Sequence, residues 1–225
     1  MTDFNKKALA GLLRFLIGLA LLLFLPAWTL RYWQAWIFLF VFSSSVLAIT
    51  VYLIKKDPQL LRRRMNAGPG AEKERSQRII QWATLIAFVA MFVFSAIDHR
   101  FQWSTVPLYI TTAGNVLIAL GLLIIFFVFR VNTFTSGIIE VDSEQKVIST
   151  GLYALVRHPM YVGALVMLFG VPPALGSAWG LCAVLVIAVA IGWRLVDEED
   201  FLIRKLPGYS EYRNKVKYRL IPFIW

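Results

Sequence analysis

The sequence is poor in cysteine and in charge. Its single cysteine, Cys182, lies among apolar residues, so the chain can form neither an internal disulfide bond nor a thiolate metal cluster. Charged residues make up 16% of the 225 residues, whereas a soluble domain has about 25%. The hydrophobic share is 59% and the mean hydropathy is +0.67. This balance excludes a soluble enzyme, a disordered protein and a disulfide-stapled secreted module, and it indicates that much of the chain faces lipid.

Acidic residues are also scarce, with 13 Asp and Glu against 23 Lys and Arg, which gives a net charge of +10. In a soluble protein this excess would raise the question of a nucleic-acid partner. Here the position of the bases explains it better, because 21 of the 23 fall in alternate connecting segments of a membrane protein. We therefore predict no nucleic-acid partner.

Five apolar runs are long enough to matter for a hydrocarbon core about 30 Å thick. They cover residues 15–30 (extended backwards by 8–13), 32–54, 79–97, 101–129 and 159–193. The last run contains Pro172 and Pro173, and adjacent prolines cannot continue a helix. We expect this run to fold as a hairpin of two short helices, about 160–174 and 177–195. The sequence thus predicts an all-α integral membrane protein with about six spans.

Six spans place all basic segments on one side, which predicts that both termini and the active site are cytoplasmic. The basic segment 55–78 is expected to contain a surface helix at about 58–66. Its arginines either touch anionic headgroups or serve only as a topology signal. On the opposite side, Asp98, His99 and Arg100 are expected to form a solvated turn. We divide the chain into the N-terminal helices with this basic loop (1–105) and a second membrane domain (106–225).

The informative polar residues lie in two predicted cytoplasmic segments, 130–161 and 194–225. In the first, 138–141 and 146–148 are β-rich and are expected to pair weakly. Pro159 suits the first turn of the hairpin helix, which places His158 at a helix N-terminus. In the second, Glu198 and Glu199 either form a solvated cap or face a cationic or polyhydroxyl ligand. Arg194 shares a helix face with Glu198. The remainder predicts an interfacial amphipathic helix.

A longer string of residues resembles a known family. Over about 115–225 the chain is similar to the isoprenylcysteine carboxyl methyltransferases and the related phospholipid methyltransferases. The residues that carry this resemblance are Gly151, Tyr153, Arg157, His158, Pro159, Tyr161 and Gly163, then Glu198 and Glu199, then Gly208, Tyr212, Arg219 and Pro222.

The resemblance implies a membrane enzyme that binds S-adenosylmethionine (AdoMet) without a Rossmann domain, and no Gly-x-Gly-x-x-Gly occurs in a suitable place. It implies no metal. The catalytic residues would be Arg194, which approaches the acceptor, and Arg157. The cofactor-binding residues would be Gln145, Lys146, Val147, Ile148, Tyr153, His158, Pro159, Met160, Tyr161, Glu198 and Glu199.

The expected function is therefore AdoMet-dependent methyl transfer to a lipid-like or prenylated acceptor, with a carboxylate as one candidate acceptor group. Membrane lipids and a hydrophobic small molecule are the expected partners. Two alternatives stay open at this point. One is a membrane NADPH-dependent sterol-type reductase, and the other is a non-catalytic lipid-binding membrane protein.

Overall fold

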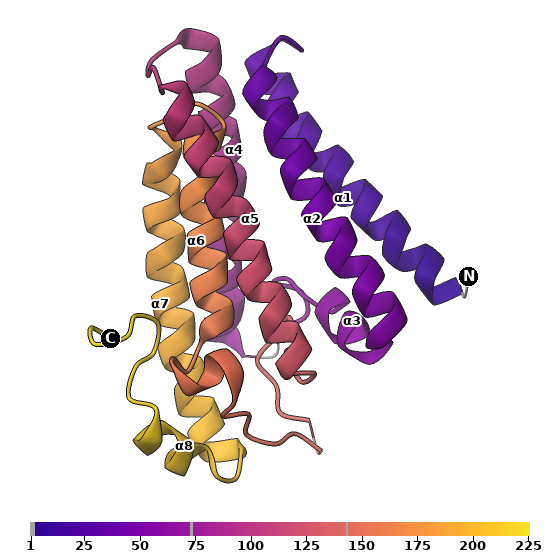
Figure 1. The fold of residues 1–225 in the computed structure, drawn as a ribbon, viewed down its shortest axis with the longest axis vertical. Helices are drawn as coiled ribbons and strands as arrows, with labels where there is room; N and C mark the ends of the chain where they lie inside the picture. Colours follow the sequence, from indigo (N-terminus) through magenta and orange to yellow (C-terminus); the bar gives the residue numbers. More distant parts are fainter. Residues whose placement is uncertain (1–2, 73, 143) are drawn as a thin grey trace.

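The computed structural model describes residues 3–72, 74–142 and 144–225, and the regular elements it assigns in these ranges are helices (Figure 1). Five helices are long and apolar enough to cross a membrane, and a sixth apolar helix is shorter. The predicted all-α membrane fold is confirmed. The elements in chain order are α1 (Asp3–Ala27), α2 (Trp33–Lys56), α3 (Pro58–Met65), α4 (Arg75–Phe101), α5 (Leu108–Val131), η1 (Gly151–Ala154), α6 (Pro159–Ala174), α7 (Gly180–Lys205) and α8 (Tyr209–Lys215).

The last two spans form the predicted hairpin, but its halves are unequal. Helix α6 has 16 residues, begins at Pro159 and ends one residue after Pro173, because a proline is tolerated in the first turn of a helix and disrupts its interior. Helix α7 has 26 residues and continues to Lys205, well past the expected end near residue 195. The acidic residues 197–200 therefore lie on this helix rather than after it.

Two local expectations are wrong. Among the described residues, 138–141 and 146–148 do not pair as strands, and the isolated bridge in this region joins Gly137 to Ala67 instead. Helix α4 runs through Asp98, His99 and Arg100, so these residues form no solvated turn, and Asp98 is fully buried. The surface helix expected at 58–66 is present as α3, while Lys73 of the same basic segment lies outside the described residues.

Helices α5 and α6 are in backbone contact along their length. A Cβ atom added to Gly121 would lie 2.5 Å from the Gly163 carbonyl oxygen, and one added to Gly114 would lie 2.5 Å from the Ala174 nitrogen. Glycine is the residue that permits such an approach of two helices in a membrane. Helix α4 packs along α7 on the other side of this pair. Helices α1 and α2 lie next to each other, at an angle to α4, α5, α6 and α7 (Figure 1).

One end of the bundle is closed by a polar network around Asp98. Its carboxylate accepts hydrogen bonds from the Ser104 hydroxyl (2.6 Å), the Ser104 backbone N–H (2.8 Å) and the Ser177 hydroxyl (2.6 Å). Nearby, the Tyr32 hydroxyl donates to the Leu175 carbonyl (2.7 Å), and the Tyr32 ring stacks on His99. These contacts tie α2, α4 and the α6–α7 turn together.

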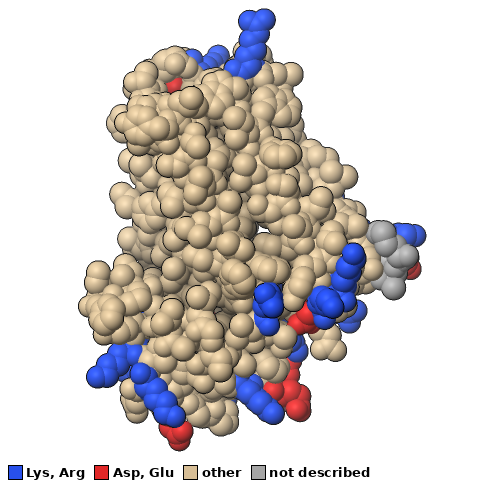
Figure 2. Space-filling view, in the orientation of Figure 1, with Lys and Arg blue, Asp and Glu red and all other residues tan. Residues whose placement is uncertain are grey.

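The opposite end carries most of the loops and the short helices. Helix α3, η1 and α8 gather around the start of α6 and the end of α7, together with residues 132–142 and 144–150, which we call the segment 132–150 (Figure 1). In Figure 2 most charged side chains in view lie at this end, and the middle of the bundle is uncharged on the face shown. The candidate site lies among these elements.

Candidate functional site

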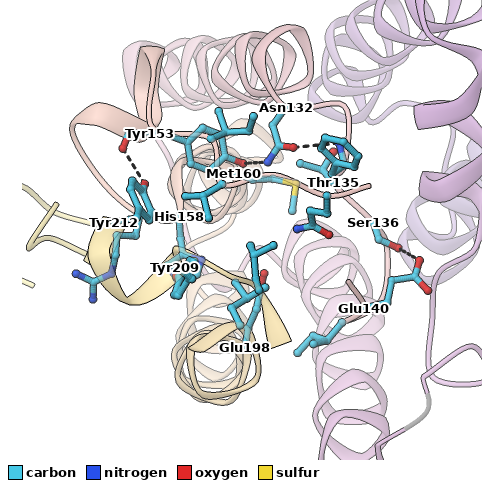
Figure 3. A pocket seen from close by; sticks show the side chains of 18 of the residues that line it. Asn132, Thr135, Ser136, Glu140, Tyr153, His158, Met160, Glu198, Tyr209 and Tyr212 are labelled. Carbon is cyan, nitrogen blue, oxygen red and sulfur yellow. Dashed lines mark hydrogen bonds between the residues drawn. The ribbon is translucent and has the colours of Figure 1, made fainter. Parts of the chain in front are cut away.

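A cavity of about 110 Å³ lies beneath the segment 132–150, between the start of α6, the end of α7 and α8 (Figure 3). Next to it lies an outer cleft of about 540 Å³. Gln145, Lys146, Val147 and Leu206 line both spaces, so they form the wall that separates them. The inner cavity is smaller than most ligand pockets, which are about 300–1,000 Å³.

Most residues predicted for the site line this one cavity. Two predicted residues do not line it, namely Pro159 and Glu199. Those that do are Gln145, Lys146, Val147, Ile148, Tyr153, Arg157, His158, Met160, Tyr161, Arg194 and Glu198. They come from three separate stretches of the chain, so the fold brings the predicted residues together. Their individual roles stay predictions.

Glu199 is a buried structural centre rather than a lining residue. Its carboxylate pairs with Arg157, lies 3.1 Å from His158 Nε2 and accepts from Arg219 Nε at 2.8 Å. Arg157 Nη1 also donates to the Val216 and Lys217 carbonyls at 2.8 and 2.7 Å. Arg157 and Glu199 therefore hold the chain after α8 against the start of α6, and they fix His158 at the cavity wall.

Glu198, one residue earlier, faces the cavity instead (Figure 3). It accepts a hydrogen bond from the Tyr161 hydroxyl at 2.6 Å. The same hydroxyl accepts from Arg194 Nε at 3.2 Å. Tyr161 of α6 thus lies between Glu198 and Arg194 of α7 and contacts both. Of these three side chains at the cavity, Glu198 is acidic and Arg194 is basic.

Residues from the N-terminal part complete the far side of the site, and the sequence did not predict them. Glu72 pairs with Arg194 Nη1 at 2.6 Å, and Gln77 accepts from the same nitrogen at 3.0 Å. Arg64 of α3 donates to the Ser136 carbonyl at 2.6 Å, and Arg63 donates to the Thr133 carbonyl at 2.8 Å. These two arginines bind the segment 132–150, beyond the headgroup or topology roles expected for α3. The sequence offered one sign of this contact, because Glu72 is a carboxylate within the strongly basic segment 55–78.

Arg64 sits close to Glu198 and Arg194 without lining the cavity. Burial lowers the pKa of its guanidinium, and nearby Tyr161 and Glu198 raise it while Arg194 lowers it further. An arginine keeps its charge under such conditions, since its ordinary pKa exceeds 12. Arg64 thus contributes a positive field behind Tyr161 and Glu198.

Tyrosines form the other wall of the cavity. The Tyr153 hydroxyl accepts from Asn132 Nδ2 at 2.9 Å, and the Tyr212 hydroxyl donates to the Tyr153 carbonyl at 2.7 Å (Figure 3). Burial raises the pKa of Tyr153 to about 12 and raises that of Tyr209 and Tyr212 as well. These phenols are therefore neutral near pH 7.

Two buried hydroxyls at the cavity have no hydrogen-bond partner within the described part of the chain. They are Thr135 Oγ1 and the Tyr209 hydroxyl, on residues that are 8% and 4% exposed. An unsatisfied buried polar group costs about 1–3 kcal/mol. Neither residue was predicted from the sequence. Their position on the cavity wall indicates that a polar ligand supplies the missing partners.

The described residues contain no group of three or more His, Cys, Asp and Glu side chains arranged to hold a metal ion. The acidic and histidine side chains at the site are instead engaged with arginines and tyrosines, as in the contacts of Glu199 and Glu198. The site chemistry is that of hydrogen bonds, aromatic rings and paired charges.

Part of the chain is similar to known methyltransferases. Residues 109–207 match the family model described as phospholipid methyltransferase. Over 147 residues the chain is 27% identical to a probable protein-S-isoprenylcysteine O-methyltransferase of Oryza sativa subsp. indica, and equally to one of subsp. japonica. Each alignment covers 61% of this chain and 76% of the relative. The resemblance predicted from the sequence is confirmed.

Proposed function

We propose that this chain is a membrane methyltransferase that uses AdoMet to methylate a lipid-like or prenylated acceptor, which the match over residues 109–207 and the apolar helices support. The observation that carries the proposal is the cavity at the end of an apolar bundle, where Glu198 and the unpartnered hydroxyls of Thr135 and Tyr209 converge. The similar rice proteins are named for action on protein S-isoprenylcysteine. We extend this substrate class to the present chain as part of the proposal.

The residues at the cavity suit AdoMet chemically. The donor set offers a carboxylate, neutral phenols and backbone groups of 145–148, which match a cation that also carries polar ribose and amino-acid parts. Thr135 and Tyr209 would gain hydrogen bonds that the protein does not provide. When bound, the cofactor supplies an electrophilic methyl group on a sulfonium.

The volume of the inner cavity means that the site must open before AdoMet can bind. The inner cavity of about 110 Å³ is too small for a molecule of this kind, whereas the inner cavity and the outer cleft of about 540 Å³ together fall in the usual range. We propose that binding displaces the wall formed by 145–147 and joins the two spaces. Lys146 and its neighbours would then contact the cofactor through backbone groups.

The acceptor would meet the cofactor near Arg194. Methyl transfer is an in-line displacement, and it needs the reacting atoms aligned at about 3–3.5 Å, so positioning supplies much of the rate. A carboxylate acceptor needs no general base, and the guanidinium of Arg194 would attract and orient it. Tyr161 and Glu198 hold Arg194 from one side. We therefore favour a carboxylate and O-methylation.

The placement of the site relative to the membrane is also a proposal. Its cavity lies at the end of the bundle where charged side chains gather, so a polar cofactor would enter from water and an apolar acceptor from between the helices (Figure 2). Following the distribution of the basic residues, we place this end and both termini in the cytoplasm.

The first test is a calorimetric titration of the detergent-solubilised protein with S-adenosylhomocysteine and, separately, with NADPH. We expect binding of the former only. Binding of NADPH alone would favour the reductase, and binding of neither would favour a lipid-binding protein. His158→Ala and Glu198→Ala should each weaken S-adenosylhomocysteine binding while expression is retained, and normal binding by both variants would contradict the assigned pocket.

The acceptor is tested with methyl-labelled AdoMet and S-farnesylcysteine in detergent micelles, beside phosphatidylethanolamine in the same detergent. A label that is released as methanol by mild base indicates a methyl ester and hence a carboxylate acceptor. A base-stable label on phosphatidylethanolamine would contradict O-methylation and indicate N-methylation. Arg194→Ala should lose turnover with nearly unchanged cofactor affinity.

A further inference from the structure

We infer that Glu72 is a positioning residue that fixes the guanidinium of Arg194, so that the N-terminal part of the chain controls the acceptor side of the site. This inference rests on the proposed function for its effect on turnover. Glu72 lies in the segment between α3 and α4, outside residues 109–207 that match the methyltransferase family model. Its contact with Arg194 is an ion pair of 2.6 Å across 122 positions of sequence.

The Glu72 carboxylate is itself rigidly held. Its side chain is 1% exposed, and Oε1 accepts a hydrogen bond from Gln81 Nε2 of α4 at 2.9 Å. Its other oxygen lies 3.4 Å from the backbone nitrogen of Ile139, which donates to it. Glu72 thus connects α4, α7 and the segment 132–150. Because Gln81 and Ile139 hold its carboxylate in place, the carboxylate can in turn define the position of the Arg194 guanidinium.

Arg194 is correspondingly constrained. Nη1 donates to Glu72 and to Gln77 Oε1, while Nε donates to the Tyr161 hydroxyl. Gln77 is oriented in turn, because its Nε2 donates to Asp197 Oδ2 at 2.8 Å. Nη2 also donates to the Gly137 carbonyl at 3.4 Å. The planar guanidinium is therefore fixed in orientation, which suits a group that must present a defined face to an anionic acceptor.

Glu72 also sets the charge of the site. Arg64 and Arg194 lie close to Tyr161 and Glu198, and Glu140 and Glu198 are the glutamates that line the cavity. Glu72 supplies a further negative charge, paired directly with Arg194. Without it, a largely buried guanidinium would lose its closest counter-charge, and breaking one partner of a buried pair is costly. We therefore expect Arg194 to change position when Glu72 is neutralised, even though the cofactor contacts remain.

The test compares Glu72→Gln with Glu74→Gln, a matched change at an exposed glutamate two residues away. We expect Glu72→Gln to lower kcat with S-farnesylcysteine at least tenfold while its affinity for S-adenosylhomocysteine stays within threefold of the wild type. Glu72→Asp, which keeps the charge, should recover part of the rate. Glu74→Gln should match the wild type in both measurements. Adding Glu72→Gln to Arg194→Ala should cause no further loss.

Two results overturn the inference. One is a Glu72→Gln protein with wild-type kcat. The other is a double variant whose fold-loss in kcat equals the product of the losses of the two single variants, Glu72→Gln and Arg194→Ala. Thermal unfolding of the wild type, the two single variants and the double variant gives a check that needs no activity, because additive shifts from the two substitutions would show that Glu72 does not hold Arg194. A wild type that methylates no acceptor overturns the proposed function and the turnover role of Glu72, and the unfolding cycle then decides whether Glu72 holds Arg194.

Discussion

The two ends of the helix bundle each contain a buried carboxylate network, and they differ in what they leave open. At one end Asp98 accepts three hydrogen bonds from two serines, and these bonds join neighbouring loops and helices. At the other end Glu199 is bound by two arginines and lies against a histidine, but its neighbour Glu198 faces a cavity. Burial of charge alone therefore does not identify a functional site.

The distinguishing feature is a cavity lined by groups without partners, since buried atoms without a partner in the described ranges also occur towards the Asp98 end, at Gln34 Oε1 and Thr111 Oγ1. Thr135 and Tyr209 at the cavity have hydroxyls that find no partner among the described residues, whereas the Asp98 carboxylate is satisfied by two serines. Polar groups that are satisfied stabilise the fold, and groups that lack a partner at a cavity indicate a ligand. Substitutions at the two ends should therefore separate stability from ligand affinity.

Glu199→Ala should have the largest effect. It leaves Arg157 without its carboxylate partner in a buried position, and it releases Arg219 and the tail. Breaking a buried pair in this way costs about 3–5 kcal/mol, so we expect a large fall in apparent Tm and loss of cofactor binding. Differential scanning fluorimetry in detergent measures the first, and calorimetry the second. A stable Glu199→Ala protein would show that the network is not structural.

Asp98→Ala should destabilise the protein without changing the site. It removes the acceptor of two serine hydroxyls and one backbone N–H, which we expect to cost about 2–3 kcal/mol. Because this network lies at the far end from the cavity, the Kd for S-adenosylhomocysteine at low temperature should match the wild type. A changed Kd with an unchanged Tm would show that the Asp98 network serves ligand binding rather than stability.

Glu198→Gln should lower ligand affinity and leave stability unchanged, whereas Asp98→Ala should lower stability and leave affinity unchanged. The side chain keeps its size and its contact with Tyr161, and it loses only the charge that faces the cavity. We expect S-adenosylhomocysteine to bind about tenfold more weakly, which corresponds to about 1.4 kcal/mol, with little change in Tm. Equal loss of stability and affinity would place Glu198 with Glu199 as a structural group.

Tyr209→Phe and Thr135→Val should have the smallest effects. Each should raise the stability of the ligand-free protein slightly and lower its affinity for the cofactor. Each removes a buried hydroxyl without a partner in the ligand-free protein, so unfolding in the absence of ligand should become slightly harder. Each also removes a hydrogen bond to the bound cofactor, so affinity should fall by about threefold. Reduced stability together with unchanged affinity would show that these hydroxyls serve the fold.

Much of the fold was predictable because lipid imposes simple rules. Apolar length predicted the spans, and Pro159, Pro172 and Pro173 predicted both ends of α6. The length of α7 was not predictable from hydropathy, because its last turns leave the apolar run and carry residues 197–200. The burial of Asp98 was missed for a related reason, since its partners Ser104 and Ser177 lie on other segments.

The site was predictable only where a motif carried it. Residues from 145 to 161 and the pair at 198–199 came from a resemblance over one part of the chain, and the fold brings most of them to one cavity. Glu72, Gln77 and Arg64 belong to a different part and reach the site through tertiary contacts. No local pattern reports a pairing between residues so far apart in sequence.

The glycine contacts between α5 and α6 restrict how the site can open. With Gly114, Gly121, Gly163 and Gly170 bringing the two backbones together, a Cβ atom at any of these positions would lie within 3 Å of the facing helix. We therefore expect Asn132 at the end of α5 and His158 at the start of α6 to keep their separation when a ligand binds. The opening that admits a nucleoside-sized molecule is then expected from residues 144–150 and from the chain after α7, while α5 and α6 keep their places.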